Sequence, residues 1–323
     1  METIKLGNTE FEGKNNVYVL RGDGEVTLVD TGVSTPSVRR QLRDAMAEWD
    51  LSFADVDTVV LTHWHADHSG LAGEIQQASG AEVVVHELDA PLVRKDPESL
   101  SSLEELQRRT FTEWGMPEGK LDAILARLER GEAVWGDPVE VTTVREGDRI
   151  EVSGHELEVV HAPGHTDGSA CYVLPGGREA FVGDVVLPVY TPNVGGADLR
   201  VERPLEKYTV TLERVAEAGF DRIYPGHRDV IEAPAERART ILDHHHDRTE
   251  RVVEVLREHG PADAWTVSAH LFGELEGIHI MHGPGEAFAH LDHLVRHGVV
   301  TETADGYALS VDSEGEVDVA SLF

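Results

Sequence analysis

The stretch Thr62-His63-Trp64-His65-Ala66-Asp67-His68 gathers three histidines and one aspartate within six consecutive residues. The apolar, β-branched run 56–61 that precedes it predicts a buried strand. The run 69–75 that follows predicts the start of a helix. Open α/β folds place their sites where a strand ends and a helix begins, so this stretch is a candidate site.

The side chains of this stretch are of the kinds that bind metal ions. Successive residues of an extended segment alternate in direction, so His63 and His65 point to the same side. The turn into the helix can then present Asp67 and His68 at a neighbouring point. Zinc and related divalent metals prefer imidazole nitrogens and carboxylate oxygens. The spacing therefore predicts a metal site and makes an ordinary polar turn the weaker interpretation.

Further ligands are expected downstream, because one loop does not complete a metal site. Three residues each follow a β-rich run and lie at a glycine-bearing turn: His165, Asp184 and His227. Each alone could be a turn residue. Together with Asp30 and the histidine-rich stretch, in this order, they resemble the metallo-β-lactamase-fold hydrolases. The resemblance covers roughly residues 1–235, and it implies an α/β fold built as an αββα sandwich.

The resemblance also implies a dinuclear metal site with seven ligands. In the family pattern one metal would be held by His63, His65 and His165. The second would be held by Asp67, His68 and His227, with Asp184 bridging the two. Asp30 would support the ligands without binding metal. The implied cofactors are two divalent metal ions, with zinc as the first choice and iron or manganese as alternatives.

This ligand set implies a hydrolase. A hydroxide held between two metals, around the catalytic Asp67 and Asp184, would be the nucleophile, because the metals lower the pKa of water from 15.7 toward about 7. It would attack an electrophilic carbonyl or phosphorus, and no side-chain nucleophile is needed. The second metal has no cysteine ligand, unlike typical β-lactamases of this fold, so hydrolysis of antibiotics is not expected. His65 stands where the diiron flavoprotein relatives have glutamate, so their redox chemistry is not expected either.

Three functions remain open after these exclusions. A glyoxalase-II-like hydrolase of a small-molecule thioester or ester is the first. A metal-dependent endoribonuclease of the winged-helix branch is the second, so RNA is a less favoured partner. A metal-stabilised, non-catalytic binding protein is the third. Release of thiol from an acyl thioester, or cleavage of single-stranded RNA, would discriminate among them.

The chain is strongly acidic. Lys+Arg number 28 and Asp+Glu 60 among 323 residues, a formal net charge of −32. The acidic residues spread over the whole chain, as in proteins of salt-loving organisms, and we expect a halophilic protein. An ordinary acidic enzyme is the alternative. Such a surface generally disfavours nucleic acid. Hydrophobic residues make up 40%, which argues against disorder.

The compartment is expected to be the cytoplasm. The one cysteine, Cys171, lies in an apolar strand and is expected in the core. A disulfide within one chain is thus excluded, and the start of the sequence lacks the features of a signal peptide. No apolar run approaches the length of a membrane span, so a membrane partner is not expected.

The chain divides into three parts by pattern. Residues 1–232 form the expected catalytic domain, with a polar helical insertion at about 91–131 that would cover the site as a lid or pad an edge. Residues 311–323 form an acidic, loose tail. In the loop 187–196 beyond Asp184, Tyr190 and Asn193 are candidate substrate contacts, because loops at strand ends shape pockets.

Residues 233–310 show a different pattern, of helices at 235–259, 266–271 and 284–296 followed by a hairpin. This order resembles the winged-helix module of one branch of the superfamily. The third helix lacks a basic surface, so we expect a packing or dimer element, with a homodimer as a partner state. Several histidines here, at 244–246, 279, 282, 290, 293 and 297, are expected to be solvated or partly buried. Flanking glycines place His279 and His282 in a loop.

Overall fold

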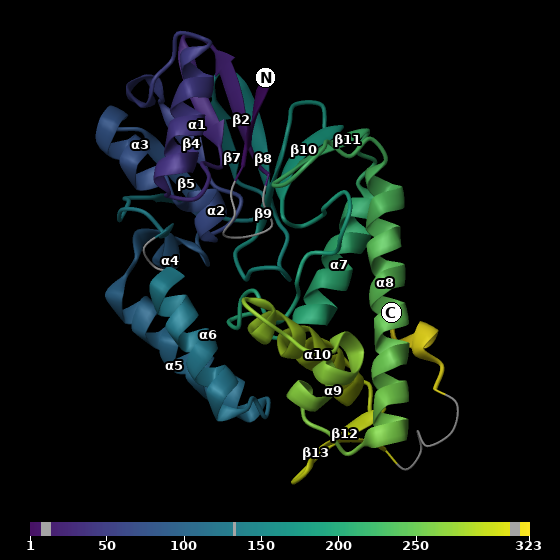
Figure 1. Cartoon of the computed structure of the whole chain (residues 1–323). Helices are drawn as coiled ribbons and strands as arrows, with labels where there is room; N and C mark the ends of the chain where they lie inside the picture. The colour runs from purple at the N-terminus through teal and green to yellow at the C-terminus, as the bar shows by residue number, and fades with distance from the viewer. Residues whose placement is uncertain (8–13, 132–133, 311–316) are drawn as a thin grey trace.

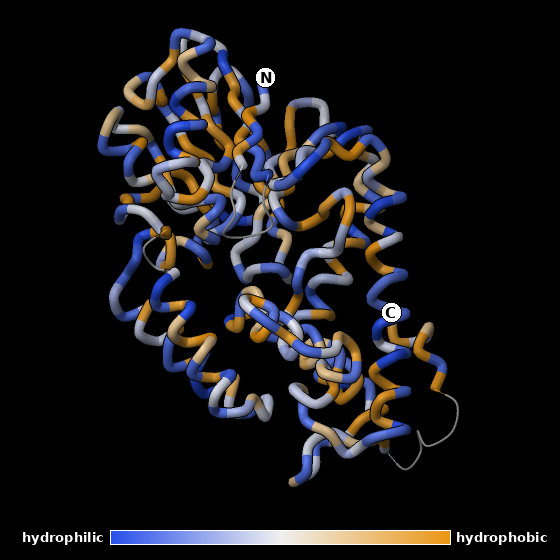
Figure 2. Tube along the Cα trace, viewed as in Figure 1, coloured by the Kyte–Doolittle hydropathy of each residue, from blue (hydrophilic) through white to orange (hydrophobic). Residues whose placement is uncertain are grey.

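Two β-sheets packed face to face, with helices on their outer faces, form the larger part of the protein in this computed structural model (Figure 1). The structure describes residues 1–7, 14–131, 134–310 and 317–323. The expected αββα sandwich is confirmed. Hydrophobic residues concentrate along the strands, and α8 alternates between hydrophilic and hydrophobic stretches (Figure 2).

The first sheet has its strands in chain order, β1 to β6, and the second has the order β11-β10-β9-β8-β7. The first comprises β1 (Glu2–Leu6), β2 (Asn15–Gly22), β3 (Glu25–Val29), β4 (Thr58–Val60), β5 (Glu82–His86) and β6 (Thr142–Val144). The second comprises β7 (Arg149–Val152), β8 (His155–His161), β9 (Ala170–Val173), β10 (Glu179–Gly183) and β11 (Arg222–Pro225). β3 to β6 are parallel, as are β10 and β11, so their carboxyl ends share one edge of the sandwich.

Helices cover both outer faces of the sandwich. On the first sheet lie α1 (Pro36–Ala47), α3 (Ala72–Ser79) and α4 (Ala90–Arg94), and on the second lie α7 (Pro204–Glu217) and α8 (Pro234–His259) (Figure 1). Thr35 caps α1, because its hydroxyl accepts a hydrogen bond from the Val38 amide, and Pro36 takes the first helical position. Among the described residues no helix has the length and apolar character to span a membrane.

Aromatic side chains fill the space between the sheets. The ring of Tyr18 lies 5.1 Å from that of Phe181 and 5.5 Å from that of Tyr224. Cys171 is buried on the other side of the second sheet, in the apolar cluster formed with α7 and α8, as the sequence predicted. These two cores fix the strands rigidly and so position the loops that leave their carboxyl ends.

The insertion folds as two helices, α5 (Pro97–Glu113) and α6 (Glu118–Gly131). It packs against the C-terminal segment, because Phe111, Trp114 and Ile124 belong to one buried apolar cluster with residues of α8, α9 and α10. Backbone contacts reinforce this packing, since the Trp265 amide donates to the Trp114 carbonyl at 2.8 Å. The insertion is therefore tied to both parts of the chain.

The C-terminal segment contains α9 (Ala264–Phe272), α10 (His279–Arg296), β12 (Val300–Thr303) and β13 (Gly306–Leu309). Helices followed by a hairpin agree with the expected order, and the winged-helix assignment and the division at 232/233 stay predictions. α8 spans both parts, because Ile241 packs with the second sheet and Val252 packs with α9 and α10.

The expectation that His279 and His282 lie in a loop was wrong. His279 and His282 lie in the first turn of α10, and the helix continues through Gly283, Pro284 and Gly285. Gly283 was expected to break the helix, but a Cβ there would lie 2.5 Å from the Leu275 Cδ1 atom, so close packing explains the glycine at this helical position.

The described end of the chain is also not loose. Residues 311–316 of the expected acidic tail lie outside the described residues. Val319, in a short 3₁₀ turn, is buried in the C-terminal cluster. The Leu322 carbonyl accepts a hydrogen bond from His293 at 3.1 Å. Apolar residues thus anchor residues 317–323. The expectation of a loose tail considered the acidic residues of this stretch and not its apolar ones.

Phe111→Ala is expected to lower the free energy of unfolding by about 3–5 kcal/mol, because it removes a fully buried ring from the core that joins the insertion to the C-terminal segment. Urea unfolding measures the change. The control Glu113→Ala removes an exposed side chain of the same helix and should stay within about 0.5 kcal/mol of wild type. Equal values for the two variants would contradict the shared core.

Molar KCl is expected to raise the melting temperature by on the order of 5–10 °C over dilute buffer. The formal charge of −32 opposes compaction, and the Debye length falls from about 10 Å at 0.1 M to about 3 Å at 1 M salt. Differential scanning fluorimetry measures this, with an uncharged osmolyte at equal osmolality as control. A flat or falling melting temperature would remove the salt-adaptation interpretation and leave the metal site untouched.

Candidate metal centre

All seven predicted ligands lie at the edge of the sandwich where the parallel strands end. The histidine-rich stretch follows β4, Asp184 follows β10 and His227 follows β11. His165 lies in the turn between β8 and β9. The side chains are buried except for that of His65, which is half-buried. Segments far apart in the chain thus converge because they end at one edge of two packed sheets.

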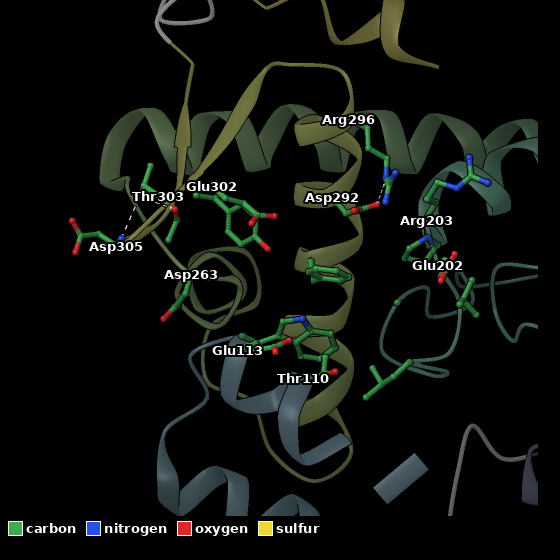
Figure 3. A pocket seen from close by; sticks show the side chains of 18 of the residues that line it. Thr110, Glu113, Glu202, Arg203, Asp263, Asp292, Arg296, Glu302, Thr303 and Asp305 are labelled. Atoms are coloured by element: carbon green, nitrogen blue, oxygen red, sulfur yellow. Dashed lines mark hydrogen bonds and ion pairs between the residues drawn. The ribbon is translucent and has the colours of Figure 1, made fainter. Parts of the chain in front are cut away.

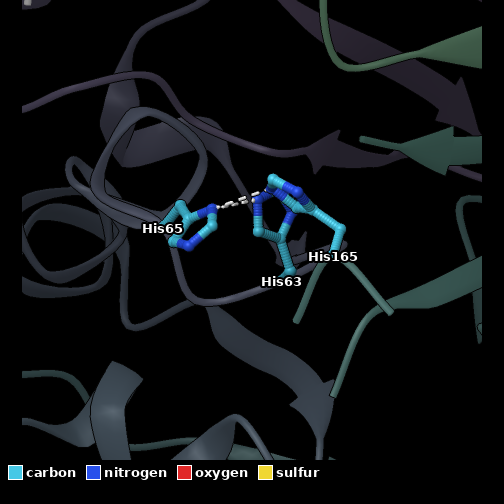
Figure 4. Close-up of side chains that lie close together, drawn as sticks. All are labelled: His63, His65 and His165. Carbon is cyan, nitrogen blue, oxygen red and sulfur yellow. Dashed lines mark hydrogen bonds between the residues drawn. The ribbon is translucent and has the colours of Figure 1, made fainter. Parts of the chain in front are cut away.

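Three histidines form the first group, with one ring nitrogen of each pointing to a common point (Figure 4). The Nδ1 atom of His65 lies 3.0 Å from the Nε2 atom of His63 and 3.1 Å from the Nε2 atom of His165. Such a cluster of nitrogen lone pairs, without a carboxylate among them, is the arrangement in which one cation can accept three imidazole ligands.

The second group combines Asp67, His68 and His227. The Asp67 Oδ2 atom lies 3.5 Å from the His227 Nε2 atom and 3.8 Å from the His68 Nε2 atom. Asp184 lies between the two groups, because its Oδ2 atom is 3.3 Å from the His227 Nε2 atom and 3.8 Å from the His165 Nε2 atom. This carboxylate therefore reaches both groups.

The other ring nitrogen of several histidines is fixed by a hydrogen-bond partner. These contacts are Thr62 Oγ1 with His63 Nδ1 at 3.1 Å, the Ala197 carbonyl with His65 Nε2 at 3.1 Å, the Asn193 carbonyl with His165 Nδ1 at 2.9 Å, and Asp30 Oδ2 with His68 Nδ1 at 2.8 Å. Partners of this kind fix the tautomer and orientation of metal-binding histidines, so the arrangement is that of a prepared ligand set.

Asp30 supports the candidate ligands from a left-handed backbone conformation, with φ of 59°. Its Oδ1 atom accepts a hydrogen bond of 2.8 Å from the Thr62 amide, while Oδ2 contacts His68. The carboxylate thus links the start of the histidine-rich stretch to its end. Asn15 plays a similar part that the sequence analysis missed, since its amide donates to Asp67 Oδ2 at 3.0 Å.

The electrostatics divide the histidines into two kinds. Burial, together with the neighbouring His68, lowers the pKa of His63 well below its ordinary value, and burial beside His165 lowers the pKa of His65 to about 4. Burial also acts to lower the pKa of His68, but the carboxylates of Asp184, Asp67 and Asp30 outweigh it and raise that pKa to about 10. His63 and His65 therefore favour the neutral imidazole form, whereas the carboxylates around His68 favour its charged form.

The residues present fit divalent metal ions. The His68 Nε2 and Asp184 Oδ1 atoms are buried and have no hydrogen-bond partner among the described residues. Leaving such atoms unpaired is costly, and a cation would satisfy both. Nitrogen and carboxylate oxygen donors, without sulfur, suit zinc and also iron or manganese.

A cavity of about 230 Å³ opens on this ligand set. Besides His65, Asp67, His165 and Asp184, its wall includes Leu103 and Gln107 of α5, Leu128 of α6, Trp135, the loop 187–199, and the start of α10 with Met281 and His282. The insertion and the C-terminal segment thus complete its wall. His282 was missed because the sequence placed it in a loop.

The two candidate substrate contacts fare differently. Asn193 lines the cavity, but its side chain is engaged in structure, because it donates to the His282 carbonyl at 3.1 Å and accepts from the Gly196 amide at 3.1 Å. Tyr190 is absent from the described cavity wall, and the Arg228 guanidinium lies over its ring at 5.0 Å. The role of Tyr190 as a substrate contact therefore stays a prediction.

A buried ion cluster that the sequence did not reveal holds the loop beside the ligands. Arg200 Nη2 lies 2.8 Å from Asp89 and 2.6 Å from Asp198, and both carboxylates are buried. Asp89 accepts from the Trp64 amide at 3.1 Å, and Asp198 accepts from the Trp64 indole at 3.3 Å. The cluster therefore fixes the histidine-rich stretch from behind.

The C-terminal histidines do not all follow the expectation of solvated or partly buried positions. His245 and His290 are fully buried, and their Nδ1 and Nε2 atoms lie 3.4 Å apart. Thr249 Oγ1 lies 2.7 Å from His290 Nδ1. This pair belongs to the packing between α8 and α10, where burial lowers the pKa of both rings and keeps them neutral.

A larger hollow of about 1020 Å³ lies elsewhere, among α5, α10 and the β12–β13 hairpin (Figure 3). Its wall includes Glu113, Glu202, Glu302 and the ion pair of Asp292 with Arg296. None of the seven candidate ligands lines it, so size alone does not identify the site. We place the functional site at the smaller cavity, where the metal-binding side chains converge.

Comparison with known proteins finds relatives that match most of the chain. A family model described as the metallo-beta-lactamase superfamily matches residues 11–227. A metallo-beta-lactamase family protein of Thermus thermophilus, TTHA1429, is 31% identical, with 96% of this chain and 98% of that chain covered and a TM-score of 0.84. A beta-lactamase domain protein of Burkholderia ambifaria is 23% identical and shares the fold, with 95% and 91% covered and a TM-score of 0.79.

Two curated proteins extend the comparison. The probable metallo-hydrolase YqjP of Bacillus subtilis is 27% identical over 90% of each chain. The atrochrysone carboxyl ACP thioesterase of Aspergillus fumigatus is 24% identical over 78% of this chain and 62% of its own length.

Proposed function

This chain belongs to the metallo-beta-lactamase superfamily, and on that premise we propose that it is a dinuclear metal-dependent hydrolase of thioesters or esters. The observation that carries the proposal is the convergence of seven candidate ligands, four of which line a cavity that also has many apolar side chains in its wall. The ligands are His63, His65, Asp67, His68, His165, Asp184 and His227. Zinc is the proposed metal.

When bound, two divalent ions supply Lewis acidity and lower the pKa of water toward about 7. The protein contributes orientation. Thr62, Asp30 and the carbonyls of Ala197 and Asn193 hold the imidazoles in fixed tautomers. Asn15 fixes the Asp67 carboxylate, so that charge and geometry are set before substrate arrives.

The cavity wall favours an acyl substrate over a nucleic acid. Trp135, Leu187, Leu199 and Ile278 are among its apolar members, and these exclude water from a carbonyl bound above the ligands. The name of the thioesterase relative supports the same class. A glyoxalase-II-like reaction is therefore the first choice. RNA-binding surfaces usually neutralise phosphates with lysine or arginine, and neither is among the residues lining the described cavity.

The test compares substrates on one preparation of full-length protein. Acyl thioesters of a small thiol are expected to release thiol, detected by a chromogenic disulfide, while single-stranded RNA stays intact on a gel. His63→Ala, purified identically, serves as the control for contaminating enzymes. RNA cleavage without thiol release would favour the endoribonuclease. Bound metal without either activity would favour a binding protein.

A further inference from the structure

The active-site cavity does not end at its apolar wall. A second hollow of about 440 Å³ lies between the two insertion helices α5 and α6. The two hollows share the side chains of Leu103, Gln107, Leu128 and Trp135. They are thus separated by no more than these side chains, and the second hollow continues the first away from the metal ligands.

The floor of this groove is apolar. Leu100 and Leu103 come from α5, Leu125, Ala126 and Leu128 from α6, and Trp135 closes one end. Trp135 packs edge-on against Trp64 of the histidine-rich stretch, with ring centroids 5.7 Å apart. The groove is therefore joined to the metal site by a continuous run of apolar contacts.

The rim of the groove carries charge. Glu104, Glu105 and Glu129 line it together with Arg108, so carboxylates outnumber the cation. An anionic group entering the groove would meet this excess of negative charge, which is less screened beside an apolar floor than in bulk water. The groove therefore suits an uncharged, flexible apolar chain.

We propose that the groove between α5 and α6 binds the distal part of a medium- to long-chain acyl group whose carbonyl lies at the metal centre. The inference rests on the proposed hydrolase function and names its substrate class. Short acyl groups would fill only the cavity of about 230 Å³, whereas longer chains would pass Gln107 and Leu128 into the groove. The insertion would then determine which acyl chain lengths the enzyme prefers.

The wild-type protein is expected to show a rise in kcat/KM with chain length. Each methylene that leaves water contributes about fourfold, equivalent to about 0.8 kcal/mol. Saturated acyl thioesters of one thiol, from about four to about twelve carbons, give the profile, with the rise expected once the chain outgrows the first cavity. A chain ending in carboxylate should react more slowly than a methyl-ended chain of equal length.

Two alanines of α6 provide a matched pair of variants. Ala126 lines the groove, whereas Ala123 is exposed and lines none of the described cavities. Ala126→Trp should remove the rise for long chains and leave the shortest thioester unchanged. Ala123→Trp should keep the wild-type profile. Leu128→Ala, which opens the connection, should improve the long chains relative to the shortest. Circular dichroism checks that each variant is folded.

A binding measurement separates the inference from the proposed function. Calorimetry with uncleavable acyl thioethers of short and long chain should show tighter binding of the long one, lost in Ala126→Trp only. A wild type that binds in this way but hydrolyses no thioester would overturn the hydrolase and leave the groove standing. A flat profile and equal thioether binding in wild type, or identical behaviour of the two alanine variants, would overturn the groove.

Discussion

Asp184→Asn is expected to reduce turnover by about a thousandfold, equivalent to about 4 kcal/mol of lost transition-state stabilisation. Burial disfavours its charge, but His227 and His68 outweigh burial and hold the pKa of Asp184 well below its ordinary value, so the carboxylate is charged at neutral pH. The amide keeps the shape but removes this charge from between the two ligand groups. Plasma mass spectrometry should find about two metal ions per wild-type chain and about one in the variant.

The matched control is Asp243→Asn, which makes the same chemical change at an exposed position of α8. It should keep both metals and full turnover. Near-ultraviolet circular dichroism should show that the Asp184→Asn fold persists. Full activity of Asp184→Asn with unchanged metal content would contradict the dinuclear proposal.

Gly226→Ala is expected to have the second-largest effect, a loss of about a hundredfold in kcat/KM, because a displacement of about 1 Å in a catalytic group has this consequence. A Cβ at this position would lie 2.4 Å from the Asp184 Oδ1 atom and 2.5 Å from the His68 Cε1 atom. Both side chains would have to shift, and both are candidate ligands that lie 3.5 Å apart, between His68 Nε2 and Asp184 Oδ1. Metal affinity, measured by competition with a chromophoric chelator, should fall in parallel.

Gly119→Ala is the control for this substitution. Gly119 lies in α6, and a Cβ added there would have no atom within 4 Å. This change should leave activity unaltered and stabilise the helix by up to about 1 kcal/mol. If Gly226→Ala retained wild-type kinetics and metal affinity, the close contact of Gly226 with Asp184 and His68 would not be needed for function.

The sequence singled out a set of candidate ligands that the structure brings together, because their signals are local. The His63–His68 stretch combines ligand types at a spacing that a strand end and a turn convert into convergence, and the structure brings all seven candidates together. Asp30 contacts His68 as the resemblance implied. The strand and helix positions also followed from apolar periodicity.

What the sequence missed depends on contacts between distant segments. Asn15 reaches Asp67 across 52 positions, and Arg200 reaches Asp89 across 111 positions, and neither pairing leaves a local pattern. Gly283 misled the assignment of the start of α10, because its close packing against Leu275 outweighs its low helix propensity.

The apolar cluster that joins α5 and α6 to the C-terminal helices has a consequence for how the protein is made. Chains emerge from the ribosome N-terminus first, and domains generally fold as they emerge. The two insertion helices are synthesised before α8, α9 and α10, which supply the partners of Phe111, Trp114 and Ile124. The apolar side chains of the two insertion helices therefore stay exposed to solvent until α8, α9 and α10 have been synthesised. A nascent chain that extends only to His227 would carry all seven candidate ligands without the residues of α10 that line the cavity, so the cavity wall is completed only after α10 has been synthesised.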